Sequence, residues 1–136
     1  MKIENTNLPH WDLSSIYSSS NGIDYKKALK TYENGINSLK NLINLPISDK
    51  NFSETLISIL TIINKTKALY TSFSSYAYCA YSTDTTNIEY LNNMALIEKK
   101  GLLLKETQRS FQQFLTTNSR YLPLFYTSYQ QHKNYE

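Results

Sequence analysis

The chain has 136 residues, a formal net charge of +3 and one cysteine. A chain of this length can form one domain whose core needs no disulfide. Lysine and glutamate are interspersed, as in Glu98-Lys99-Lys100, so no basic stripe favours nucleic-acid binding.

Two further patterns bear on location. The longest near-apolar run, 56–63, is far shorter than the roughly 20 residues of a membrane span. The segment 1–7 lacks the apolar core and small-residue cleavage site of a secretory signal. We therefore expect a soluble cytoplasmic protein that does not bind membranes.

Residues 1–20 show no sustained helical period and are predicted to form an extended arm. Pro9 disfavours helix at the residue before it, and Ser18-Ser19-Ser20 forms a polar joint. Trp11 is the largest apolar side chain of the arm. We expect it to anchor the arm on the helices, together with Leu13, Ile16 and Tyr17.

The first helix is predicted over 23–44. Asn21 is the expected cap, and Asp24 places a negative charge in the first turn, where the helix dipole is positive. Apolar residues then recur every three or four positions: Tyr25, Ala28/Leu29, Tyr32, Ile36, Leu39 and Leu42/Ile43. Gly35 weakens this helix by about 1 kcal/mol relative to alanine, which we expect it to tolerate.

The second helix is predicted over 52–82. Asn51, with Glu54 three residues later, signals its start. Thr66 and Lys67 interrupt its apolar stripe, but a lysine stem can lie along apolar surface, so we expect one continuous helix. The stripe consists of Phe52, Leu56, Ile59/Leu60, Ile63, Tyr70, Phe73, Ala77 and Ala80/Tyr81.

A corner follows the second helix. Only about four residues separate its pattern from the next, which favours an antiparallel hairpin. Thr86 and Glu89 fit a capping box, in which the threonine hydroxyl accepts from the Glu89 N–H and the carboxylate reaches back. Asp84 is expected to bond free N–H groups of the third helix.

The third helix is predicted over 87–118. Its apolar seam alternates spacings of four and three: Tyr90, Met94, Ile97, Gly101, Leu104, Gln108, Phe111 and Leu115. More apolar residues lie alongside, namely Ile88, Leu91, Ala95 and Leu102, so this helix should contact at least two others. The corner geometry puts Gly101 opposite Ala68, where two small residues would allow a close approach.

A short final helix is predicted over 121–134, because Pro123 suits a first helical turn. The predicted fold class is all-α. An extended N-terminal arm precedes an elongated antiparallel helical bundle of three long helices plus a short C-terminal helix. We expect 1–136 to be a single helical domain.

No catalytic, cofactor-binding or metal-binding constellation emerges from the sequence. Cys79 stands among alanines and tyrosines, which is typical of a small buried hydrophobe in a reducing compartment; a catalytic thiol is the alternative. The two histidines, His10 and His132, are isolated from it and from each other. Metal ligands need closer grouping, so we assign no metal, catalytic or cofactor residue.

Two segments carry a resemblance to a known family. The corner, Ala77-Tyr78-Cys79-Ala80-Tyr81-Ser82-Thr83-Asp84-Thr85-Thr86-Asn87, is similar to the Y-S-x-D-T-T corner of oligoendopeptidase F-like zinc metallopeptidases of family M3. The segment Leu8-Pro9-His10-Trp11-Asp12-Leu13-Ser14-Ser15-Ile16-Tyr17 is similar to the W-D-L-S-x-x-Y segment that opens those enzymes. The family's zinc motif, His-Glu-x-x-His with a further glutamate, has no match in this sequence.

The resemblance implies the N-terminal helical domain of an M3-type oligoendopeptidase. In the family this domain forms part of the wall of a channel that admits short peptides. The resemblance implies zinc in the full-length protein, no cofactor in this chain, and no activity of the chain alone. The implied partners are the catalytic domain of the same polypeptide, against which Trp11 would dock, and peptide substrates.

The alternative function belongs to a different class. The same apolar helices are typical of a stand-alone protein-interaction module or a self-associating helical protein. A monodisperse monomer would count against this alternative. Self-association of the isolated chain is compatible with both functions.

Overall fold

The computed structural model describes residues 12–133, which are helical apart from the arm and the connections. The prediction of an all-helical fold with three long helices is confirmed, and none of these residues forms a strand. The elements are α1 (Ile23–Ile43), α2 (Phe52–Thr83), α3 (Ile88–Thr117), the 3-10 turn η1 (Ser119–Tyr121) and α4 (Leu122–Lys133). Each long helix begins and ends within one residue of its predicted bounds.

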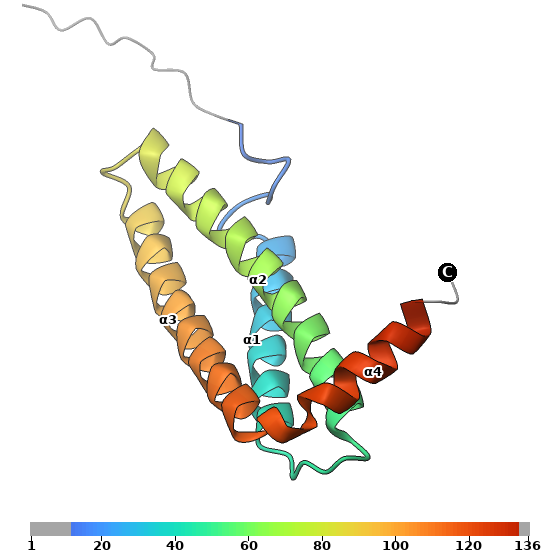
Figure 1. The fold of residues 1–136 in the computed structure, drawn as a ribbon. Helices are drawn as coiled ribbons and strands as arrows, with labels where there is room; N and C mark the ends of the chain where they lie inside the picture. Colours follow the sequence, from blue (N-terminus) through green and yellow to red (C-terminus); the bar gives the residue numbers. More distant parts are fainter. Residues whose placement is uncertain (1–11, 134–136) are drawn as a thin grey trace, which may run out of the picture.

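The three long helices lie side by side, and α4 leaves their lower end at an angle (Figure 1). Each long helix contacts the other two, as predicted for α3, and α4 contacts α2. Residues 12–22, the described part of the arm, contain no helix but are not fully extended, because the N–H of Ile16 bonds the carbonyl of Leu13 in a turn.

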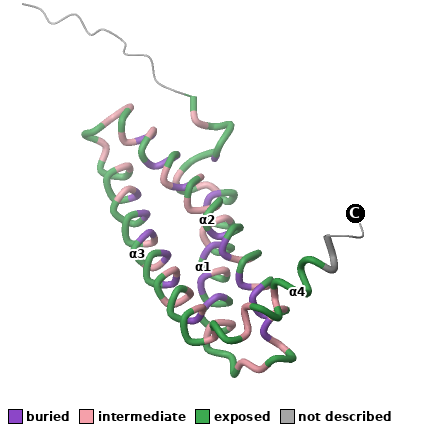
Figure 2. The backbone as a smooth tube through the Cα atoms, viewed as in Figure 1, coloured by how far each residue is buried: buried purple, intermediate pink, exposed green. Residues whose placement is uncertain are grey.

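Buried residues run along the facing sides of the helices (Figure 2) and form two clusters. The cluster nearer the α2–α3 corner, the corner cluster, contains Tyr17, Tyr25, Tyr32, Ile36, Phe73, Tyr76, Ala77, Ile97 and Leu104. The cluster nearer α4, the base cluster, contains Leu39, Phe52, Leu56, Ile59, Ile63 and Phe114. Phe52 at the start of α2 stacks on Phe114 near the end of α3, with ring centroids 6.2 Å apart.

The capping box at Thr86 and Glu89 is wrong. Asn87 caps α3 instead, and its side-chain oxygen accepts from the N–H groups of Glu89 at 2.9 Å and Tyr90 at 3.3 Å. The helix α3 begins one residue later than the capping box requires, so Thr86 precedes the cap position. The Thr86 hydroxyl donates to Asp84 instead. Asp84 also accepts from the Thr86 N–H, which precedes α3.

The start of α1 also differs from the prediction. Gly22 is its cap, without a side-chain hydrogen bond, and the Asn21 amide donates to the Glu89 carboxylate at 2.9 Å. Asp24 lies in the first turn, as expected. Its carboxylate accepts from the backbone N–H of Ser18 at 2.8 Å, so it binds the arm to the helix.

At the start of α2, Asn51 occupies the cap position but faces the preceding loop, where its side-chain oxygen accepts from the Ser48 N–H at 2.8 Å. Thr66 does not interrupt the buried stripe of α2, because only 2% of its surface is exposed. It lies against Gly35 of α1, where an added Cβ would come within 2.5 Å of the threonine hydroxyl. Gly35 therefore has a packing role.

The predicted pairing of Gly101 with Ala68 is wrong. Ala68 is exposed, and the side chain of Tyr70 lies against Gly101. A Cβ on Gly101 would approach the Tyr70 ring carbon Cζ to 2.8 Å. The glycine thus makes room for an aromatic ring, and Tyr70, not Ala68, is the α2 residue that packs on it.

Candidate functional site

The two segments that carry the family resemblance both contribute residues to one pocket. Tyr76 and Ser72, which precede the corner segment on α2, hold the arm beside it. The Tyr17 ring of the arm meets the Tyr76 ring of α2 edge to face, with centroids 5.4 Å apart. The Tyr17 and Ser72 hydroxyls lie 3.0 Å apart. Tyr17 is buried, so it anchors the described part of the arm in the corner cluster.

A polar pocket of about 400 Å³ lies at this junction. Glu89 accepts from the hydroxyl of Ser20 and the amide of Asn21, which ties α3 to the arm. The lining residues are Asp12, Leu13, Ser14, Tyr17, Ser18, Ser19, Ser20, Tyr76, Ala80, Thr83, Asn87, Glu89 and Tyr90. The pocket joins residues far apart in the sequence into one surface.

The carboxylates at this junction have structural partners. A hydrogen bond from Ser14 lowers the pKa of the Asp12 carboxyl, and hydrogen bonds from Ser18 lower the pKa of Asp24. Both groups are therefore ionised acceptors at neutral pH. A general acid would need a raised pKa instead, so their chemistry fits anchoring of the arm.

The buried tyrosine hydroxyls of α1 act as hydrogen-bond donors. Tyr25 donates to the side-chain oxygen of Asn93 at 2.8 Å, and Tyr32 donates to the carbonyl of Lys100 at 2.6 Å. Burial raises the pKa of Tyr25 and of Tyr32 to about 12. Both hydroxyls stay neutral near pH 7, so they hold α3 against α1 and do not act as bases.

Of the remaining candidate residues, only Cys79 has a side chain that the structure describes. Cys79 is a free thiol and only partly buried, whereas a buried position was expected. His10 and Trp11 lie outside the described residues, as does the side chain of His132. Within 12–133 no group of three or more His, Cys, Asp or Glu residues could hold a metal ion, and no helix is long and apolar enough to cross a bilayer.

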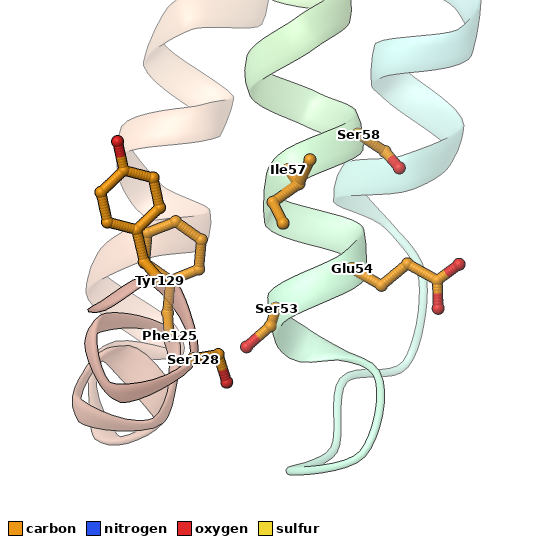
Figure 3. A pocket seen from close by; sticks show the side chains of 7 residues that line it. All are labelled: Ser53, Glu54, Ile57, Ser58, Phe125, Ser128 and Tyr129. Carbon is orange, nitrogen blue, oxygen red and sulfur yellow. The ribbon is translucent and has the colours of Figure 1, made fainter. Parts of the chain in front are cut away.

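A second hollow, of about 350 Å³, opens between α2 and α4 (Figure 3). Phe125 and Tyr129 of α4 stand on one side, with ring centroids 6.1 Å apart, and Ile57 of α2 stands on the other. The remaining lining residues are Ser53, Glu54, Ser58 and Ser128. A groove with these apolar walls suits the binding of an apolar side chain.

Sequence reasoning missed this groove. Ile57 lies beside the predicted stripe of α2 and is 54% exposed. The available signal was the excess of aromatic residues over 121–129, which is more than one buried stripe of a short helix needs.

Comparisons with known proteins identify no relative. No family model matches the chain, and neither a curated protein nor a solved structure is significantly similar to it.

Proposed function

We propose that this chain is the amino-terminal helical domain of an M3-type oligoendopeptidase and forms part of the wall of its substrate channel. The two resembling segments carry this proposal. The pocket that both segments line, with Tyr17 from the first and Ala80 and Thr83 from the second, supports it. In the proposed protein the long helices pack antiparallel as an elongated bundle in the cytoplasm.

The unpartnered apolar surface supports a larger assembly. Ile57 and Tyr129 at the α2–α4 groove and Tyr126 on α4 are more than half exposed. Burying apolar side chains of this size against a second domain contributes roughly 1.5–3 kcal/mol each. We propose that the catalytic domain of the same polypeptide covers part of this surface.

Zinc belongs to that catalytic domain in this proposal. The described residues contain no cluster for a metal ion, and the sequence lacks His-Glu-x-x-His. Zinc would supply a Lewis acid and an activated water for peptide hydrolysis. The role of the present chain is to form a channel wall that admits only unstructured peptides to the catalytic domain.

The test compares two proteins on one substrate. The product of the complete reading frame should hydrolyse a short fluorogenic peptide and lose this activity with a zinc chelator. The 136-residue chain should leave the peptide intact with or without added zinc. A complete product that cleaves no short peptide would overturn the proposal.

A stand-alone interaction module is the second candidate function. The α2–α4 groove favours it, because all of its lining residues belong to α2 and α4 of this chain. In that case the chain would function by itself, and its complete reading frame would encode no peptidase.

A further inference from the structure

The outer surface of α3 carries an apolar stripe that nothing in 12–133 covers. Ile88, Leu91, Ala95 and Leu102 are exposed along it, and the first, second and fourth of these expose 73%, 52% and 65% of their surface. At 1.5 Å per residue the stripe is about 21 Å long, which is nearly four helical turns.

The stripe continues into a groove of about 580 Å³ between α2 and α3. Leu102 belongs to both, and Tyr70 and Leu104 provide more apolar lining. Gly101 creates space here, since a Cβ at this position would collide with the Tyr70 ring. The complete lining is Lys67, Tyr70, Glu98, Gly101, Leu102, Leu104, Lys105 and Gln108.

The charges of the groove are unbalanced. Lys67 and Lys105 line it with one carboxylate, that of Glu98, and beyond Lys105 the exposed Glu106 and Arg109 of α3 carry opposite charges. The apolar stripe therefore ends in a region of positive charge. A partner that covers the stripe binds more favourably if it carries acidic residues at that end.

We propose that this surface binds an amphipathic helix with acidic residues flanking its apolar face. Exposed positions Ile88, Leu91, Ala95, Glu98, Leu102 and Lys105 follow alternating spacings of three and four, which match the side-chain rows of a helix laid along α3. An extended peptide finds no backbone partners on the side of a helix, because the N–H and C=O groups bond within it.

A second copy of the chain is a poorer occupant. It would bring the same excess of Lys67 and Lys105 over Glu98 to this surface, and like charges across an interface oppose association. The proposal does not rest on the peptidase function, because the groove consists entirely of α2 and α3.

The experiment measures binding of two labelled synthetic helical peptides to the complete chain by fluorescence anisotropy. Both peptides have leucine in a heptad pattern, with glutamate at the flanking positions in the first and lysine in the second. The glutamate peptide should bind more tightly, and added salt should weaken its binding. Equal affinity for the two peptides, or no binding of either, would overturn the proposal.

Substitutions then locate the binding surface. Leu102→Glu should weaken binding of the glutamate peptide by about tenfold or more, because it removes a buried leucine contact and adds a like charge. Ile23→Glu is the matched control, since Ile23 is 87% exposed on α1 and should leave binding unchanged. Equal effects of the two changes would contradict the assignment.

Charge reversal gives an independent readout. The double variant Lys67→Glu, Lys105→Glu should prefer the lysine peptide, provided that its helical circular dichroism and melting match those of the natural chain. An unchanged preference would overturn the role of these lysines. Sedimentation of the chain alone completes the test, because a dimer that Leu102→Glu disrupts would assign the surface to a second copy instead.

Discussion

The two buried clusters use different chemistry to hold the same helices together. The corner cluster places tyrosine hydroxyls on polar partners, as in Tyr25 with Asn93 and Tyr32 with the Lys100 carbonyl. The base cluster consists of aliphatic and phenyl side chains and includes the stacked rings of Phe52 and Phe114. The corner cluster should therefore respond to pH and to polar substitutions, and the base cluster to lost volume.

The largest effect is expected in the base cluster. Phe52 is fully buried, so Phe52→Ala should lower the free energy of unfolding by about 3–5 kcal/mol through lost contacts and a cavity. Urea denaturation measures this change. Ile57→Ala, on the exposed side of the same helix, is the control and should cost much less. Equal losses of unfolding free energy in the two variants would contradict the assignment of Phe52 to the core and of Ile57 to the exposed groove.

Alkaline pH should destabilise the corner cluster. The pKa of Tyr25 and of Tyr32 is about 12 in the folded chain, against about 10 in an unfolded chain. Their contribution is therefore complete below pH 10 and is lost as the pH rises through 12. Above both values the loss is roughly 2 kcal/mol for each tyrosine.

Urea denaturation across this pH range measures the loss. The double variant Tyr25→Phe, Tyr32→Phe should show a flatter decline, because neither phenylalanine can ionise. An equally steep decline in that variant would show that other groups cause the alkaline effect.

Gly101→Ala should cost less than the cavity in the base cluster. The new Cβ meets the Tyr70 ring, and such overpacking typically costs about 1–3 kcal/mol, partly offset by the better helix propensity of alanine. Thermal melting by circular dichroism measures the change. A second substitution, Tyr70→Leu, should relieve the clash. A destabilisation that persists in the double variant would contradict this explanation.

The smallest effect is expected on the exposed arm. Hydrogen bonds from Ser18 lower the pKa of Asp24 in the folded chain, so their contribution is present above the pKa of a free aspartate and is lost as the pH falls through the lowered value. Asp24→Asn should flatten the acid side of the stability profile. An unchanged profile would mean that the arm does not depend on this carboxylate.

Helix bounds were predictable because local periodicity and few breaks determine them. The caps were less predictable. At α3 the predicted cap, Thr86, is one residue from the actual cap, Asn87. At α1 the side chain of Asn21 bonds Glu89, which is distant in the sequence, and does not cap the helix. The contact of Tyr70 with Gly101 depends on packing among three helices, which the corner alone does not specify.

The candidate sites were only partly predictable. The motif residues of the arm and the corner were identified from the sequence, but the pocket that both segments line required the fold. The α2–α4 groove depends on the angle at which α4 packs on α2, so Ile57 and Phe125 gave no joint signal. The stripe on α3 was visible as a pattern, but its exposure was not.

The reading frame around the codon for Glu136 tests the proposed function most directly. Sequencing of the native transcript would show whether the frame continues. The account predicts several hundred further codons that include His-Glu-x-x-His with a glutamate downstream. A stop codon directly after Glu136, or a continuation without this motif, would contradict it and leave the chain as a helical interaction protein.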